Sequence, residues 1–356
     1  MLDQATRITA GGVAAGVAFF IAPVFAGDLG PVLHLPLDDG TGSIVASDTS
    51  GNGLDGTLMN FDTASCWVPA VANLGLSCDG SDDFVRVADD PLLDFGEGDF
   101  SVSFWVLKRS TSAGTNYDNL YGVSKWSTGQ QPGANEWLLN VGVGNQSEIS
   151  DRPRFVVESG TRHYATTGLV GLTLGEWHHL VGVRRDDELR LYVDGVLVAA
   201  DTSLPCRAAV NDSGRNLNIA RNEGGFRPAT DGIFDEVQVY RFALRDGGVG
   251  VGDTAGGEVA VLFSTPDQAI VRSASTTTTT LPRCPVDCGD AVTDGQITAT
   301  DALFALRSAV RLETCALCVC DANRSGDITA TDALVILRAA VGSPEVLDCP
   351  CRVVVG

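Results

Sequence analysis

The sequence contains little positive charge. Its 356 residues include 24 Lys and Arg against 45 Asp and Glu, a formal net charge of −21, and only Lys108 and Lys125 are lysines. Binding to nucleic acids and to anionic lipid surfaces depends mainly on basic side chains. The charge therefore argues against a nucleic-acid-binding protein and against one held on an anionic membrane.

Long apolar runs are lacking after residue 26, so we expect no membrane span in the rest of the chain. The N-terminus has Arg7, then an apolar stretch over residues 8–26 that ends Val24-Phe25-Ala26. This pattern predicts a secretory signal peptide, residues 1–26, cleaved after Ala26. The alternative, a membrane anchor, is disfavoured because the stretch is short and contains three glycines and a proline. We expect a secreted protein, either extracellular or associated with a cell surface.

No long helical stripe of apolar residues follows. Short alternating runs, as in residues 100–107, are instead separated by turn signals such as Asp194-Gly195, which favours a type I′ hairpin. About 230 residues of this kind predict a mainly β fold, a jelly-roll β-sandwich over residues 27–268.

Several motifs carry a specific resemblance. They are Leu33-His-Leu-Pro-Leu-Asp-Asp39, Asp48-x-Ser-Gly-Asn-Gly-x-Asp-Gly56, Asp79-Gly-Ser-Asp-Asp-Phe-Val85, Gly98-Asp-Phe-Ser-Val-Ser-Phe-Trp105, Gly175-Glu-Trp-His-His-Leu180, Leu191-Tyr-Val-Asp-Gly195 and Gly232-Ile-Phe-Asp-Glu-Val237. Together and in this order they resemble the laminin-G-like, or concanavalin A-like, jelly roll. Because that fold carries lectins, adhesion modules and glycosidases, the resemblance implies a fold more than a function.

Two sites are predicted in the sandwich. Asp48 and Asn52 offer oxygens for a calcium ion at the rim, and the resemblance implies that Asp235 lies nearby; alternatively, Asp48 and Asn52 only hydrogen-bond their own turn. The aromatic residues Tyr117, Tyr121 and Trp126 are candidates for stacking on a sugar, although they could equally be core residues.

The sequence gives no catalytic constellation. Glycosidases of this fold resemble one another in a Glu-x-Asp-x-Glu strand, which we do not find, and the resemblance assigns Asp235-Glu236 to a structural strand. His178 and His179 have no nucleophile or metal partner placed beside them by sequence. We therefore predict no catalytic residue.

Ten cysteines in an exported protein favour disulfides over metal sites. Cys66 and Cys78 are equidistant from a bend near Ala72, so we expect them to face each other in a hairpin and form a disulfide. Then either Cys206 bridges to the C-terminal region or two thiols remain free.

A Thr-rich linker, residues 269–283, leads to a duplicated module at 284–351. Ile297-Thr-Ala-Thr-Asp-Ala-Leu303 recurs as Ile328-Thr-Ala-Thr-Asp-Ala-Leu334, and three cysteines repeat with the same offset of 31. Each repeat contains a twelve-residue loop with oxygen-bearing side chains at the spacing of EF-hand calcium ligands. The expected Ca²⁺ ligands are Asp290, Asp294, Gln296, Thr298 and Asp301 in the first loop, and Asp321, Asn323, Ser325, Asp327, Thr329 and Asp332 in the second. Val292 supplies no oxygen, so we expect the first loop to bind more weakly.

Two tandem loop–helix repeats behind a linker resemble a type I dockerin. That resemblance implies calcium-dependent docking to a cohesin-type scaffold module. The matching surface positions, at the ends of the loops and on helices expected at 302–310 and 333–341, are Ala299, Thr300, Leu306, Arg307, Ala330, Thr331, Leu337 and Arg338.

The sequence thus predicts a secreted, non-catalytic protein whose sandwich recognises a glycan or an extracellular protein and whose tail attaches it to a scaffold or surface. The first alternative is a dockerin-borne glycoside hydrolase that acts on polysaccharides. The second is a surface adhesin or structural protein without a cohesin partner.

Overall fold

The computed structural model describes residues 29–111, 120–127, 133–143, 151–205, 208–224, 229–273, 288–291, 296–313, 315, 317–323, 325, 327–343 and 347. The predicted signal peptide and most of the linker lie outside these residues, as do Tyr117, Cys206 and Asp294. In the described part of the chain, no helix is long and apolar enough to cross a membrane.

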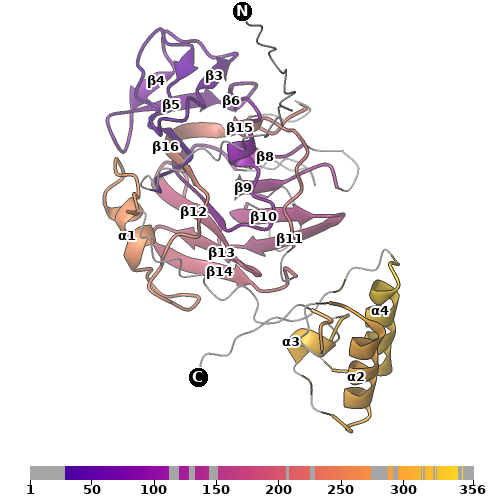
Figure 1. The fold of residues 1–356 in the computed structure, drawn as a ribbon. Helices are drawn as coiled ribbons and strands as arrows, with labels where there is room; N and C mark the ends of the chain where they lie inside the picture. The colour runs from indigo at the N-terminus through magenta and orange to yellow at the C-terminus, as the bar shows by residue number, and fades with distance from the viewer. Residues whose placement is uncertain are drawn as a thin grey trace, which may run out of the picture.

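Residues 29–273 form a β-sandwich of two antiparallel sheets, which confirms the predicted fold class (Figure 1). The first, here the β7 sheet, has the order β14 (Val196–Asp201), β13 (Glu188–Val193), β12 (Trp177–Arg185), β7 (Phe100–Lys108), β16 (Asp231–Tyr240), β5 (Leu74–Asp79) and β4 (Trp67–Pro69), with β1 (Leu33–Leu35) also paired to β16. The second, the β8 sheet, has the order β11 (Arg162–Thr167), β10 (Arg154–Ser159), β9 (Trp137–Gly142), β8 (Leu120–Lys125), β15 (Leu217–Ile219), β6 (Phe84–Val87), β3 (Gly56–Met59) and β2 (Val45–Ala46).

The main core lies between the sheets and follows from the alternation of each strand. In β7, Phe100, Val102, Phe104 and Val106 are fully buried in it, as the sequence predicts. A short 3₁₀ helix, Pro91–Leu93, adds the buried Leu93. The predicted hairpin is also confirmed, because β13 and β14 are joined through Asp194 and Gly195, which both have positive φ.

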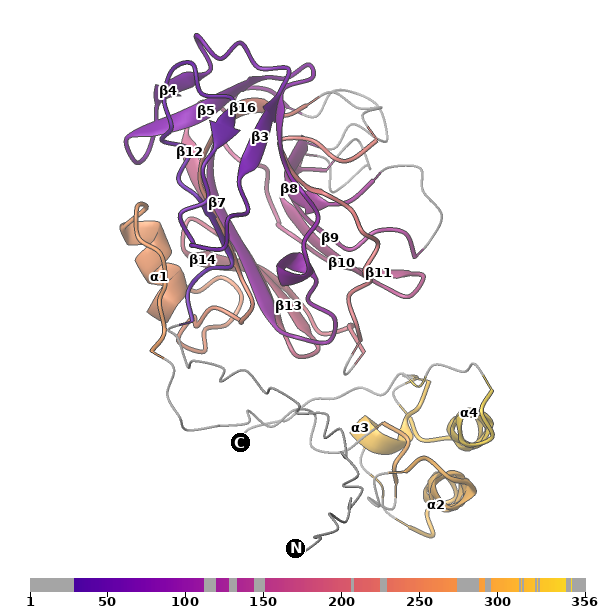
Figure 2. The same cartoon turned by 45° about the horizontal axis from the view of Figure 1, so that its top comes forward.

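The outer face of the β7 sheet is covered by a helix that the sequence analysis does not predict. Helix α1 (Gly257–Ser264) buries Val259 and Leu262 against Val181, Tyr192 and other residues of β12 and β13. Both faces of this sheet are therefore covered here. The outer face of the β8 sheet lies on the opposite side of the sandwich (Figure 2), and every residue of β8 and β9 is buried.

Both lysines of the chain are buried in ion pairs. Lys108 Nζ lies 2.8 Å from Asp151 Oδ1, and Lys125 Nζ lies 2.8, 2.6 and 2.9 Å from oxygens of Asp89, Asp94 and Glu136; neither lysine side chain is exposed. Buried ammonium groups require such partners, because an unpaired charge in the interior is costly.

The predicted disulfide between Cys66 and Cys78 is wrong in this structure, in which both are buried free thiols. The hairpin exists, but its register pairs Trp67 with Leu76, so Cys66 lies opposite Ser77 and accepts its backbone N–H. The bend is centred between residues 71 and 72 rather than at Ala72, and this shift of half a residue removes the expected pairing.

The C-terminal module is built on α2 (Ala299–Ala309), α3 (Leu317–Cys320) and α4 (Ala330–Ala340) (Figure 2). Helices α2 and α4 begin three residues earlier than predicted, because Thr298 and Thr329 cap them through capping boxes with Asp301 and Asp332. A small core of mainly alanine and branched aliphatic side chains joins the helices. Cys315 and Cys320 form a disulfide, and Cys288 is also disulfide-bonded.

Candidate functional site

The outer face of the β8 sheet carries a small apolar cluster. Tyr121, Leu138 and Val156 are almost fully buried there, with Trp126 and Ala165 packed partly exposed against them. Their strand neighbours Val123, Leu139 and Phe155 point the other way, into the main core. The period of two along each strand therefore separates an inner apolar face from this outer face.

A band of polar residues crosses the same face from β10 to β6. Cross-strand pairing sets Arg154 beside Asn140 and Asn140 beside Tyr121. One row further along, it sets Ser124 beside Asn218 and Asn218 beside Arg86. We call these six residues the polar band.

Two amides of the polar band have unsatisfied oxygens. Asn140 is 2% exposed and Asn218 is fully buried, and the Oδ1 atom of each has no hydrogen-bond partner among the described residues. A buried acceptor without a partner is destabilising, and such atoms in a native fold usually have a functional or solvent partner. Both oxygens are enclosed in this structure, so a ligand hydroxyl group can donate to them only when a neighbouring side chain moves aside.

The structure brings together two of the three predicted sugar-stacking residues. Trp126 is half-buried, and its ring meets His163 at 5.0 Å between centroids and 62° between planes. Tyr121 is only 1% exposed, so its ring is part of the cluster rather than an open stacking surface. Tyr117 lies outside the described residues. Asn140, Asn218 and the arginines were not predicted, because no sequence signal distinguishes a polar residue at an outward strand position from an ordinary solvated one.

Two carboxylates next to this face, those of Glu136 and Glu158, form hydrogen bonds and ion pairs within the fold. Glu136 accepts hydrogen bonds from the backbone and hydroxyl of Ser213 and lies against Lys125. Glu158 accepts the backbone N–H groups of Gly133 and Asn135, at 2.6 and 2.8 Å. Because their oxygens are engaged by the fold, these two residues do not present the open carboxylate pair of a glycosidase.

The predicted calcium site at the rim is not assembled through contacts between its residues. Asp48 accepts the backbone N–H groups of His34, Ser50 and Leu54, and the Asn52 amide donates to the Val32 carbonyl. These contacts correspond to the alternative in which both residues stabilise their own turn. Hydrogen bonding by the backbone amides also lowers the pKa of Asp48 despite its partial burial.

Asp235, the third residue of that prediction, is fully buried and accepts the backbone N–H of Ala72 in the β4–β5 turn. Burial raises its pKa to about 8. A calcium ion shared by Asp48, Asn52 and Asp235 therefore stays a prediction.

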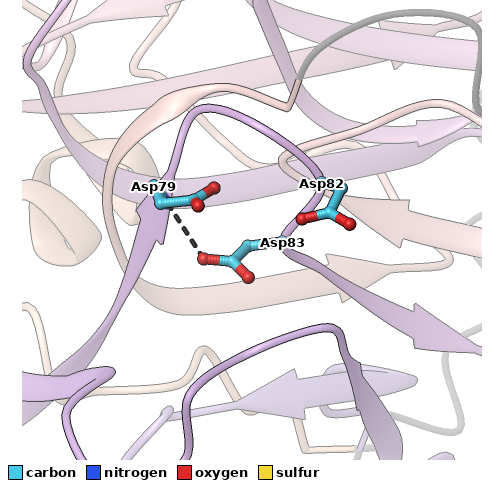
Figure 3. Close-up of side chains that lie close together, drawn as sticks. All are labelled: Asp79, Asp82 and Asp83. Atoms are coloured by element: carbon cyan, nitrogen blue, oxygen red, sulfur yellow. Dashed lines mark hydrogen bonds between the residues drawn. The ribbon is translucent and has the colours of Figure 1, made fainter.

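A separate acidic cluster lies in the turn between β5 and β6, where Asp79, Asp82 and Asp83 point toward one another (Figure 3). The carboxylate of Asp83 accepts the backbone N–H of Asp79 at 3.0 Å, and burial together with the neighbouring carboxylates raises the pKa of Asp83. The close approach of these carboxylates is therefore explained by the tight turn in which they lie.

In the second loop of the C-terminal module, side-chain oxygens accept hydrogen bonds from the backbone of the same loop. Asp321 and Asp332 are fully buried, and oxygens of Asp321 and Asn323 accept the backbone N–H of Ser325, at 2.8 and 2.9 Å. Asp332 accepts the N–H groups of Asn323 and Thr329. Two carboxylates, an amide and a hydroxyl on one short loop form the kind of oxygen donor set that calcium prefers.

Less of the first loop is described. Asp290 and Asp301 are buried like their counterparts in the second loop, Thr298 caps α2, and Gln296 is exposed. Asp294 lies outside the described residues. The predicted inequality of the two loops is therefore untested.

The predicted partner-binding residues lie on the surface of the module, and four of them line one groove. All eight, Ala299, Thr300, Leu306, Arg307, Ala330, Thr331, Leu337 and Arg338, are solvent-exposed. A groove of about 340 Å³ runs between α2 and α4, lined by Ala299, Ala302, Leu303, Leu306, Ala330, Ala333, Leu334 and Leu337. Every lining residue has its equivalent 31 positions away, so the groove is pseudo-symmetric and almost entirely apolar.

Comparison with known families agrees with the fold. Residues 79–249 match the model of the concanavalin A-like lectin/glucanases superfamily. This part of the chain is therefore a concanavalin A-like jelly roll. No curated protein sequence matches the chain significantly.

Solved structures with a similar fold include domain 4 of an extracellular arabinanase from Geobacillus stearothermophilus in complex with arabinotriose (17% identity, 61% of this chain and 94% of that one, TM-score 0.45). Others are the binding domain of Paraclostridial Mosquitocidal Protein 1 (13%, 61% and 50%, 0.43) and that of botulinum neurotoxin DC in complex with rat synaptotagmin II (14%, 67% and 52%, 0.45). The chain spans about half the length of the latter two. None of these similarities identifies a ligand for this chain.

Proposed function

We propose that this concanavalin A-like jelly roll belongs to an exported, non-catalytic protein that binds carbohydrate on the outer face of the β8 sheet. The observation that carries the proposal is the polar band, in which the buried side-chain oxygens of Asn140 and Asn218 have no partner among the described residues and lie beside an apolar cluster. Sugars present hydroxyl donors next to apolar C–H surfaces, and this arrangement complements both. The apolar N-terminal stretch ending at Ala26 supports export.

The test uses residues 27–356 and a panel of polysaccharides in affinity electrophoresis, with a reducing-sugar assay on the same mixtures. We expect retarded migration in at least one polymer and no release of sugar. Trp126→Ala should weaken binding about 10-fold, which corresponds to about 1.4 kcal/mol. Trp177→Ala, on the β7 sheet, is the matched control and should leave binding unchanged. Released oligosaccharide would instead support the glycoside hydrolase alternative.

We further propose that residues 284–351 form a calcium-dependent dockerin-like module, with the second loop as the stronger site. Without metal the buried carboxylates Asp321 and Asp332 repel each other in a module too small to offset this by apolar burial. Calcium should then stabilise the folded module by mass action.

Calorimetric titration of the full chain should resolve two unequal sites. Asp321→Ala should abolish the tighter one, and Asp290→Ala should affect only the weaker one. The titration is run on oxidised and reduced protein, because the Cys315–Cys320 disulfide can hold the metal-free fold. Two equal sites, or no calcium binding, would contradict this part of the proposal.

The groove between α2 and α4 is the surface we assign to a cohesin-type scaffold module. Leu303 and Leu334 are 54% and 45% exposed on it, and an apolar face of this kind requires a partner. Leu306→Glu should abolish capture by immobilised cohesin, whereas Leu312→Glu, at a more exposed position outside the groove, should not. If the unmodified chain forms dimers that Leu306→Glu dissociates and cohesin is not bound, the adhesin alternative is favoured.

A further inference from the structure

Several arginines of the sandwich are paired with nearby carboxylates. Arg109 lies 2.7 Å from Asp231, Arg190 lies 2.5 Å from Asp246, and Arg215, Arg272 and others have similar ion pairs. Arg184, which is fully buried, instead donates to the carbonyl groups of Gly96, Gly98 and Ala208. In a chain with nearly twice as many acidic as basic residues, such pairing is expected.

The two arginines of the polar band have neither a carboxylate partner nor a set of carbonyl acceptors among the described residues. Arg86 and Arg154 are both half-buried, neither forms an ion pair, and the buried Nε atom of each has no hydrogen-bond partner among the described residues. Arg86 lies over the ring of Phe84 at 5.2 Å. Arg154 is largely removed from solvent and has no charged partner in the described part of the chain, and this burial lowers its pKa. Two partly desolvated guanidinium groups on one face are costly to the fold, which suggests that they have a ligand.

We infer that the ligand of the polar band is an acidic polysaccharide, whose carboxylate or sulfate groups pair with Arg86 and Arg154. The inference rests on the proposed carbohydrate-binding function and names its substrate class. The geometry of a guanidinium group matches both kinds of anion through paired N–H donors.

The spacing of the two arginines favours a polymer. Arg154 is on β10 and Arg86 on β6, four strands apart, which places their backbones about 19 Å from each other. Asn140 and Asn218 lie between them and offer acceptors for hydroxyl groups. An extended chain with repeated anions and intervening hydroxyls matches this order, whereas an acidic peptide supplies few side-chain donors for the two amide oxygens.

The test compares polymers that differ only in charge. Residues 27–356 are titrated with polygalacturonate and with its fully methyl-esterified form, and in parallel with dextran sulfate and dextran. We expect one acidic polymer to bind at least 10-fold more tightly than its neutral counterpart, with an affinity that falls as salt rises. The arm that binds identifies carboxylate or sulfate as the recognised group.

Arg86→Gln and Arg154→Gln should each reduce binding to the acidic polymer about 10-fold. Neither should markedly lower the melting temperature, because neither arginine forms an ion pair with a described residue and Arg86→Gln loses only the contact with the ring of Phe84. Arg241→Gln removes an exposed charge elsewhere on the sandwich and is the matched control. A loss of melting temperature without a loss of affinity would assign the arginines a structural role and overturn the inference.

Equal binding of the charged and neutral polymers would also overturn the inference while leaving the proposed function intact. Failure of every polysaccharide to bind would overturn both. Polyglutamate binding as tightly as polygalacturonate would replace the glycan by an acidic protein partner.

Discussion

His179 should make the sandwich sensitive to acid. The residue is 1% exposed on β12, where its ring stacks on Trp105 at 4.9 Å and its Nε2 atom lies 2.8 Å from Ser103 Oγ. Burial disfavours the charged ring and lowers the pKa of His179 to about 3. In the unfolded chain the pKa of histidine is about 6.5.

Because the folded pKa is the lower one, acid protonates the unfolded chain before the folded one. The contribution of the neutral His179 to the free energy of unfolding is complete above about pH 6.5 and is lost as the pH falls toward 3. Between these limits the loss is about 1.4 kcal/mol per pH unit, which gives about 2 kcal/mol at pH 5 and about 3 kcal/mol at pH 4.

The measurement is the free energy of unfolding in urea between pH 4 and pH 7.5, followed by tryptophan fluorescence. All five tryptophans lie in the sandwich, so the C-terminal module does not contribute to the signal. His179→Gln keeps a polar group beside Ser103 but does not titrate, so from pH 7 to pH 4 it should lose about 3 kcal/mol less than the unmodified chain. Parallel pH profiles for His179→Gln and the unmodified chain would refute the reasoning.

Three further substitutions test the packing. Lys125→Met should cost about 3 to 5 kcal/mol in urea unfolding, because it leaves the buried Glu136 without its cation; a cost under 1 kcal/mol would contradict this. Gly122→Ala should cost about 1 to 3 kcal/mol by the same measurement, since its Cβ would lie 2.3 Å from Phe104 Cζ, and an unchanged midpoint would argue against that contact. Thr329→Ala should destabilise α4 by about 1 kcal/mol in EDTA, measured by amide hydrogen exchange, and unchanged exchange there would count against the cap.

Much of the fold could be predicted because its signals are local. Alternation in residues 100–107 and the Asp194-Gly195 turn fix one strand and one hairpin directly from the sequence. Helix α1 could not be recognised, since Gly257-Glu-Val-Ala-Val-Leu-Phe-Ser264 has apolar residues on every side and becomes helical by packing Val259 and Leu262 on the β7 sheet. Tertiary contacts decide the structure of so short a segment.

The candidate site was less predictable for a different reason. Trp126 could be proposed from its residue type. The polar band, however, depends on the register of five strands, and the register between strands far apart in the sequence cannot be predicted from any one of them. The same limit explains Cys66 and Cys78, where the position of the bend decides which residues face each other. By contrast, the calcium loops are contiguous, so their ligand spacing is visible in the sequence.

The burial of both lysines has a practical consequence. With the Nζ atoms of Lys108 and Lys125 enclosed by carboxylates, no lysine amine of the folded chain is accessible to amine-reactive dyes, crosslinkers or coupling surfaces. Amine chemistry on the native protein is therefore confined to its α-amino group, so immobilisation holds every molecule by the same point and leaves the outer face of the β8 sheet unmodified. Labelling of either lysine would in turn report that the sandwich has opened.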